Sequence, residues 1–155
     1  MRKKLARIAL LSMLALTACS SKKETEAVPT APEILETDTI DIKTQKYIQS
    51  YIDQHYRKTT LDSISINKDL GTAAADDYVA MVYLTWDVKN NGKNTHDMLK
   101  MHSTDMSVRV YADLPEIQEL VIFWSIPYLN SDAKISYVRT EKGMQLSDEY
   151  YGFSY

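Results

Sequence analysis

Two segments of the chain alternate apolar with other residues along their length, and this pattern restricts the possible fold more than any other feature. In residues 78–88 one face holds Tyr78, Ala80, Val82, Leu84, Trp86 and Val88. In residues 118–128 the corresponding face holds Leu120, Ile122, Trp124 and Ile126. Successive side chains of a strand point to opposite faces, so both segments are predicted to be strands with one buried face. Met81 and Tyr83 indicate partial cover on the second face, and Pro127 is expected at a strand end or edge.

The segment before these strands shows helical spacing instead. In residues 38–58 apolar side chains recur three and four positions apart, at Ile40, Tyr47, Ile48, Tyr51, Ile52 and Tyr56. This spacing predicts an amphipathic helix with one face against a core. Leu61, Ile64 and Ile66 suit a short strand after the helix. A fourth strand is predicted over residues 133–140, with a turn at Lys142-Gly143.

A second helix is predicted between the two long strands. Asn94 is a suitable N-cap and Asp97 places an acid in the first turn, which favours a helix starting there. Its inner stripe would be Met98, Leu99, His102, Met106 and Val110. Leu114 precedes Pro115 and is expected to end the helix. Residues 107–112 also alternate, so a strand over that part is the alternative.

The elements follow one another as helix, strand, strand, helix, strand, strand within residues 38–155, a length suited to one domain. We expect an α+β fold in which two helices pack on one face of a four-stranded antiparallel sheet, because this arrangement buries every apolar stripe. The end of the chain adds four rings, at Tyr150, Tyr151, Phe153 and Tyr155. These rings are expected either to cover the open face of the sheet or to form part of an interface.

The start of the chain has the residue order of a secretory signal. Four basic residues come first: Arg2, Lys3, Lys4 and Arg7. An apolar run over residues 8–18 follows, with small residues next to the only cysteine of the chain, Cys19. The run is far shorter than the roughly 20 residues that cross a bilayer.

The end of this run, Leu16-Thr17-Ala18-Cys19, resembles the lipobox of bacterial lipoprotein precursors. The resemblance implies cleavage between Ala18 and Cys19 and a diacylglycerol on the Cys19 sulfur, which would hold the protein on the extracytoplasmic face of the cell membrane. It divides the chain into a removed signal peptide (residues 1–18), a lipidated N-terminus with a flexible tether (residues 19–37) and a single domain (residues 38–155). With Cys19 modified, the mature protein would have no disulfide and no thiolate metal site.

Charge narrows the possible partners. Cleavage would remove four of the 18 basic residues and none of the 21 acidic ones, which takes the formal charge from −3 to about −7. Such a domain is not expected to bind nucleic acid, whose recognition needs a basic surface. The four glycines form no phosphate-binding loop, and no cofactor is expected. The expected partners are the membrane, through the lipid, and an envelope protein or ligand that the sequence does not identify.

The histidines are the candidates for metal or catalytic chemistry. His96 and His102 are six positions apart, which places them roughly 120° apart around a helix and off the shared face that a metal pair needs. Ser103 and Asp105 complete the residue types of a hydrolase triad, but neighbouring helical side chains point about 100° apart. We therefore assign no metal ligand and no catalytic residue, and expect His102 to be a hydrogen-bonded, half-buried core residue.

Paired acids are the other candidates for acid–base chemistry. They occur at Asp38/Asp41, Asp76/Asp77 and Asp148/Glu149. Such pairs can transfer protons when one carboxyl is buried and its pKa raised. These pairs lie at predicted element boundaries among polar residues, so helix-start and turn charges are the expected interpretation.

Two functions of different classes fit the sequence. The leading hypothesis is a membrane-tethered lipoprotein of the cell envelope that acts as a non-enzymatic binding module through the outer face of its sheet and its aromatic end. The alternative is a small envelope hydrolase or assembly enzyme whose site forms only in three dimensions, from His55, His102 and a distant acid.

Overall fold

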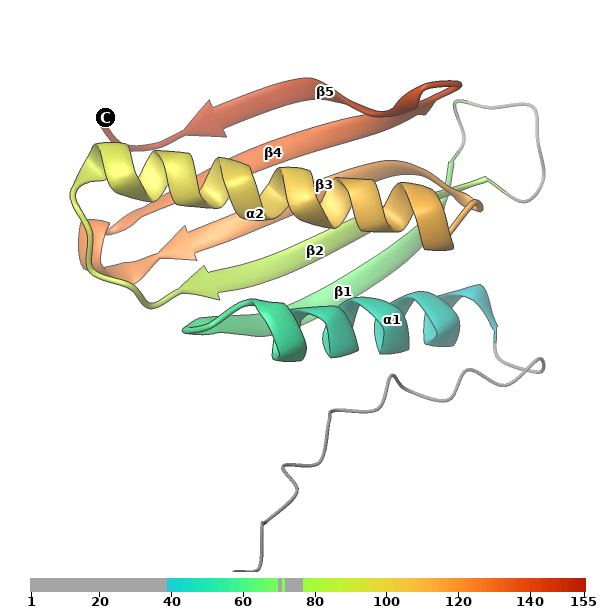
Figure 1. The fold of residues 1–155 in the computed structure, drawn as a ribbon, viewed down its shortest axis with the longest axis horizontal. Coiled ribbons are helices and arrows are strands. Elements are labelled where there is room, and N and C mark those ends of the chain that lie inside the picture. Colours follow the sequence, from blue (N-terminus) through green and yellow to red (C-terminus); the bar gives the residue numbers. More distant parts are fainter. Residues whose placement is uncertain (1–38, 70, 72–76) are drawn as a thin grey trace, which may run out of the picture.

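The strands form one sheet, and the two α-helices lie on the same side of it (Figure 1). The computed structural model describes residues 39–69, 71 and 77–155. In chain order the elements are α1 (Ile40–His55), β1 (Thr59–Lys68), β2 (Tyr78–Trp86), α2 (Gly92–Asp113), β3 (Ile117–Ile126), the 3-10 helix η1 (Pro127–Leu129), β4 (Ser131–Thr140) and β5 (Gly143–Tyr151). The strands lie in the order β1-β2-β3-β4-β5, and every neighbouring pair is antiparallel except β2 and β3, which are parallel.

The α+β class with two helices is confirmed, but the expected four-stranded antiparallel sheet is wrong in two respects. β2 and β3 are parallel because α2 carries the chain back along the sheet, as a crossover connection does. A fifth strand follows the predicted turn at Gly143, where φ is +138°, and β5 pairs with β4 along its length. The sequence pattern does not show β5, because this edge strand is exposed at most positions and lacks an apolar alternation.

The core lies between the sheet and the helices. The predicted inward faces of β2 and β3 are confirmed: alternate residues of 80–86 and 120–126 are at most 2% exposed. β1 joins them through a bulge at Asp62, without which Leu61 and Ile64 could not both face the helices. Pro127 begins η1 directly after β3, at the predicted strand end.

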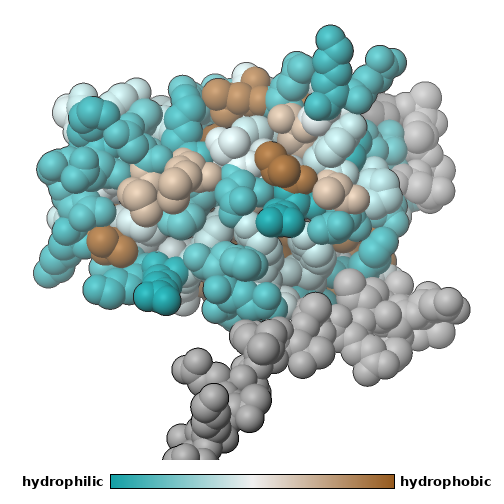
Figure 2. Space-filling view, in the orientation of Figure 1, coloured by the Kyte–Doolittle hydropathy of each residue, from teal (hydrophilic) through white to brown (hydrophobic). Residues whose placement is uncertain are grey.

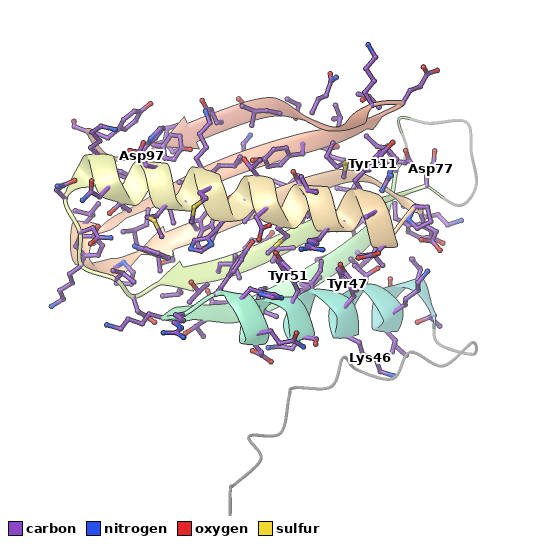
Figure 3. All side chains as sticks on the ribbon, in the orientation of Figure 1. Lys46, Tyr47, Tyr51, Asp77, Asp97 and Tyr111 are labelled. Carbon is purple, nitrogen blue, oxygen red and sulfur yellow. The ribbon has the colours of Figure 1, made fainter. Side chains whose placement is uncertain are left out.

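α1 lies close to its predicted bounds and contacts α2 through tyrosines. Figure 3 shows Tyr47 and Tyr51 pointing from α1 toward α2, where their hydroxyls donate to the carboxylates of Asp113 and Asp105 respectively. Partial burial raises the pKa of Tyr51 to about 12, and the hydrogen bond to Asp105 adds to this effect. The two helices are therefore joined by tyrosine hydroxyls as well as by apolar contact.

The predicted start of α2 is wrong by three residues. Asn91 is the N-cap, and its side-chain oxygen accepts a hydrogen bond from the Asn94 backbone N–H at 2.8 Å. Both asparagines can cap a helix, so residue type alone does not choose between them. The alternative strand over residues 107–112 is also wrong, because α2 continues through Asp113 to a C-cap at Leu114.

The buried face of α2 contains small polar residues that the predicted stripe did not include. Of that stripe, Leu99, Met106 and Val110 are buried. The remaining buried positions are Thr95, Ser103 and Ser107. The Ser103 hydroxyl accepts a hydrogen bond from the Trp124 indole N–H at 2.9 Å, which satisfies a buried donor of β3. Short side chains let the helix pack close to the sheet.

The C-terminal end of α2 is held by a side chain from the sheet. The last carbonyls of a helix have no partner within it, and the last turn of α2 contains no basic residue. Arg139 of β4 donates to the carbonyl oxygens of Val110, Tyr111 and Leu114 at 2.9–3.1 Å, and its Nε donates to that of Ile117 at 2.8 Å. One guanidinium thus joins the end of α2, the start of β3 and β4, and its charge suits the negative end of the helix dipole.

We expect Arg139→Met to lower the free energy of unfolding by about 3 kcal/mol, because four carbonyl oxygens lose a charged donor. Urea unfolding of the full chain, followed by tryptophan fluorescence, measures this change. Arg57→Met removes an exposed guanidinium between α1 and β1 and is the matched control, expected to stay within about 0.5 kcal/mol of wild type. Equal stability of the two variants would show that the Arg139 hydrogen bonds do not stabilise the fold.

Candidate functional site

The open face of the sheet, meaning the face away from α1 and α2, carries a row of side chains that crosses all five strands. The register pairs Ser63 with Tyr83, Tyr83 with Phe123, Phe123 with Lys134, and Lys134 with Tyr150. Paired residues of neighbouring strands point to the same face, so these five side chains stand side by side. We call them the central row.

Two stacked rings form the middle of the central row. Tyr83 and Phe123 have ring centroids 4.7 Å apart and ring planes 8° apart. In this stack, Tyr83 of β2 and Phe123 of β3 each contact the other ring with the ring face that is directed toward the neighbouring strand. The second face of Tyr83 is therefore directed toward β1, where its paired residue, Ser63, is small.

A groove runs beside the central row. It has a volume of about 850 Å³, and its walls include Tyr83, Phe123 and Ser125. Leu84 and Trp124 also line it, and because their side chains are buried on the helix side, they contribute backbone to its floor. The groove thus crosses the strands, with tall rings on one side and a short serine on the other.

Charged residues in the groove give it a negative balance. Asp62, Asp132, Asp148 and Lys134 line it on the open face. The Thr85 hydroxyl donates to Asp62 Oδ2 at 2.8 Å, which orients that carboxylate. Lys134 Nζ lies 2.6 Å from Asp148 Oδ2, and this contact holds the pKa of Asp148 below its ordinary value. Among the described residues that line the groove, Lys134 has the one ammonium, and it is paired with Asp148. The carboxylates of Asp62 and Asp132 give the groove its negative balance.

The acids Asp148 and Glu149 lie within β5 and not at the expected element boundary, and they do not act as a pair. Asp148 contacts Lys134 on the open face, whereas Glu149 Oε2 lies 3.0 Å from Lys100 Nζ of α2 on the helix side. Neighbouring residues of a strand point to opposite faces, so the two carboxyls cannot share a proton.

Several predicted features lie outside the described residues. These are the cleavage and lipidation positions Ala18 and Cys19, the tether over residues 19–37, and the acids Asp38 and Asp76. Asp41 is described and lies in the first turn of α1, as expected of a helix-start charge.

The half-buried position expected for His102 is confirmed, but its side chain contacts aromatic rings of the described residues instead of making the expected hydrogen bond. Its ring centroid lies 4.4 Å from that of Tyr56, 5.6 Å from that of Trp86 and 6.5 Å from that of Trp124. Burial lowers the pKa of His102, and the charge of Asp105 partly offsets this effect. The site favours the neutral imidazole.

The other residues of the considered triad point elsewhere. Ser103 is fully buried, and its hydroxyl accepts a hydrogen bond from the Trp124 indole. The Asp105 carboxylate accepts a hydrogen bond from the Tyr51 hydroxyl. His55 is exposed at the end of α1. The hydrolase stays a hypothesis, since the positions named for it form no nucleophile–base pair in the part of the chain that the structure describes.

The aromatic end of the chain does not cover the open face. Tyr151 and Phe153 pack against the core, and the Tyr155 ring stacks on His96 with centroids 3.8 Å apart. Tyr150 belongs to the central row and is 57% exposed. The expectation that these rings cover the open face is therefore wrong, and the row keeps one exposed ring.

Gly92 makes room for this end of the chain beside the first turn of α2. A Cβ at position 92 would lie 2.2 Å from the carbonyl oxygen of Ser154. Figure 1 shows the C-terminus next to the start of α2. The missing side chain of Gly92 therefore has a packing role.

The surface over the helices differs from the open face. Figure 2 shows it as mainly hydrophilic, with hydrophobic residues in scattered positions. Its exposed apolar side chains include Ile42, Met101 and Val108. Scattered residues of this kind are normal on a protein surface. The open face is the better candidate for a binding site.

The groove residues were only partly predictable. Tyr83 and Met81 indicated cover on the second face of β2, and Val121 and Phe123 of β3 carry the same signal. Two adjacent central strands with apolar residues on both faces indicate a face that is more than a solvated surface. Asp62 could not be recognised, because its position depends on the bulge in β1.

Comparisons with protein-family models, curated proteins and solved structures found no match. Among the described residues, no three histidines, cysteines or acids are grouped so that they could hold a metal ion. Within the same ranges no helix has the length and apolar character needed to cross a membrane. The assignment of a function therefore depends on the groove and on the N-terminal sequence.

We expect the stability of the fold to fall between pH 7.5 and pH 5.5 because of His102. Its folded pKa lies below the ordinary value near 6.5, so the unfolded chain takes up the proton first and stability is lost as the pH falls below that value. Urea unfolding at both pH values measures the loss, which should shrink in His102→Leu and persist in the exposed control His55→Gln. An unchanged pH dependence in His102→Leu would contradict this account.

Proposed function

We propose that the protein is a lipoprotein of the bacterial cell envelope whose domain binds a partner in the groove of its open face, without catalysing a reaction. The observation that carries the binding role is the stacked pair Tyr83 and Phe123, which forms one wall of a groove that neither α1 nor α2 covers in the part of the chain that the structure describes. Grooves with apolar walls and a few placed polar groups are the usual form of a ligand site.

The N-terminal sequence supports the location. The order of basic residues, apolar run and Leu16-Thr17-Ala18-Cys19 favours export followed by lipidation of Cys19. Two acyl chains give stable attachment, whereas one chain gives only marginal binding. The domain would then meet its partner at the membrane surface, on the extracytoplasmic side.

The side chains of the groove support binding over catalysis. Tyr83 and Phe123 offer contact area, and Asp62 is oriented by a neutral hydroxyl. Asp148 is paired with Lys134, which favours its charged form over proton transfer near neutral pH. Rings and fixed charges of this kind provide affinity and orientation.

We expect Cys19→Ala to abolish lipid attachment. Cells fed a labelled palmitate should yield labelled wild-type protein whose mature N-terminus is Cys19, and unlabelled, uncleaved Cys19→Ala protein, because the sulfur is the acceptor. Ser20→Ala is the matched control and should keep the label. A mature protein that begins elsewhere, or that carries an unmodified thiol, would refute the proposed location.

We expect partner contact to map to the open face. A photoreactive benzoylphenylalanine at position 150, on the groove, should give a discrete cross-linked product in cells. The same group at position 108, which is 59% exposed on α2, should not. Phe123→Ser should remove the product from position 150, because it removes half of the ring pair. Equal cross-linking from positions 150 and 108 would contradict a binding role for the groove.

A further inference from the structure

We propose that the groove binds an extended basic peptide segment of a partner protein, with one lysine or arginine side chain at Asp62 and a second at Asp132. The proposal rests on the proposed function and specifies its ligand by charge and spacing. The shape of the groove, its negative charge and the free face of the Tyr83 ring all favour such a ligand.

The first subsite combines a carboxylate with a ring face. Asp62 is the bulge residue of β1, next to Ser63, and the Thr85 hydroxyl orients its carboxylate. The unstacked face of Tyr83 is directed toward β1, the strand that carries Asp62, and both residues line the groove. A cation that pairs with Asp62 there would also lie over the Tyr83 ring, an arrangement that favours guanidinium and ammonium groups.

The second subsite lies at the far side of the groove. A smaller hollow of about 490 Å³ adjoins the groove and shares Ser125, Asp132 and Tyr150 with it. Asp132 therefore stands where the two hollows meet, within reach of a side chain that runs along either of them. Tyr150 adds an exposed ring beside it.

The spacing of the two subsites fits an extended peptide. Asp62 is on β1 and Asp132 on β4, so three strand spacings separate them, which is roughly 14 Å. Four residues of an extended chain span roughly 13 Å. Basic residues four positions apart would place one cation at each carboxylate, with the intervening residues over the rings.

The charge balance disfavours the other ligand classes. Nucleic acid, phosphate and acidic lipid would meet Asp62 and Asp132 with the wrong sign, while Lys134 is already neutralised by Asp148. A neutral sugar could contact the exposed rings, but it would bring no positive charge to Asp62 and Asp132. A linear polyamine shares the charge of the peptide and is separated from it by the test.

The test is calorimetric titration of the full-length chain, held in detergent micelles, with a blocked pentapeptide that has arginine at both ends and Gly-Ser-Gly between them. The same peptide with uncharged citrulline at both ends is the matched ligand control. We expect the arginine peptide to bind at least tenfold more tightly than the citrulline peptide, and its affinity to fall with added salt. Spermidine and a neutral oligosaccharide are titrated in parallel.

Variants assign the binding to the groove. Asp62→Asn and Asp132→Asn should each lower the affinity for the arginine peptide about fivefold, because each substitution removes one ion pair in a partly exposed site. Glu141→Gln makes the same charge change at an exposed position in the turn between β4 and β5 and should leave the affinity unchanged. Urea midpoints of all three variants show that they remain folded.

Three results would overturn the proposal: citrulline and arginine peptides that bind equally, an Asp62→Asn effect no larger than that of Glu141→Gln, or binding of spermidine or the oligosaccharide without binding of the peptide. None of these results would change the expected outcome of the Cys19 lipidation experiment or of the cross-linking experiment at position 150. Loss of the cross-link at position 150 would instead remove the proposed function itself, so the two failures are distinguishable.

Discussion

The contact between the Arg139 guanidinium and the end of α2 is the interaction on which the arrangement of the sheet depends. α2 must return the chain so that β3 lies parallel to β2 in one register, with the Tyr78 N–H donating to the Glu116 carbonyl at 2.9 Å. Arg139 fixes this return by binding the last carbonyls of the helix and the first of β3. The same register places Tyr83 beside Phe123, where their rings stack.

The packing of α2 shows why its inner stripe was only half visible in the sequence. An apolar stripe read by hydropathy contains Leu99, Met106 and Val110, and these are buried. Ser103 is buried as well, because the Trp124 indole needs an acceptor and a short side chain leaves space for the indole. A serine that satisfies a buried donor looks like a solvent residue until its partner on another element is known.

Much of the fold could be predicted, because both helices and four strands carry periodic stripes of residues such as Ile48, Val82 and Ile122. β5 could not, since an edge strand exposed on both faces carries no period-2 signal. The parallel pairing of β2 and β3 follows from the helix between them, but periodicity does not state which strands become neighbours. The groove was the least predictable feature, because it brings together residues of five strands through a register that includes the bulge at Asp62.

The chemistry of the open face also explains why a one-sided sheet is suited to a binding module. Helices on one face bury enough apolar surface to define the fold, so the residues of the other face are not needed for the core. A face with no partner would be most soluble with polar residues at its centre, yet the two central strands present Tyr83 and Phe123 there, with Asp62 and Asp132 at the margins. Rings at the centre and charges at the rim are the pattern of a surface that is covered by a partner for part of the time. If the proposed basic partner binds there, the acidic rim would attract the positive charge of that partner before the rings contact it.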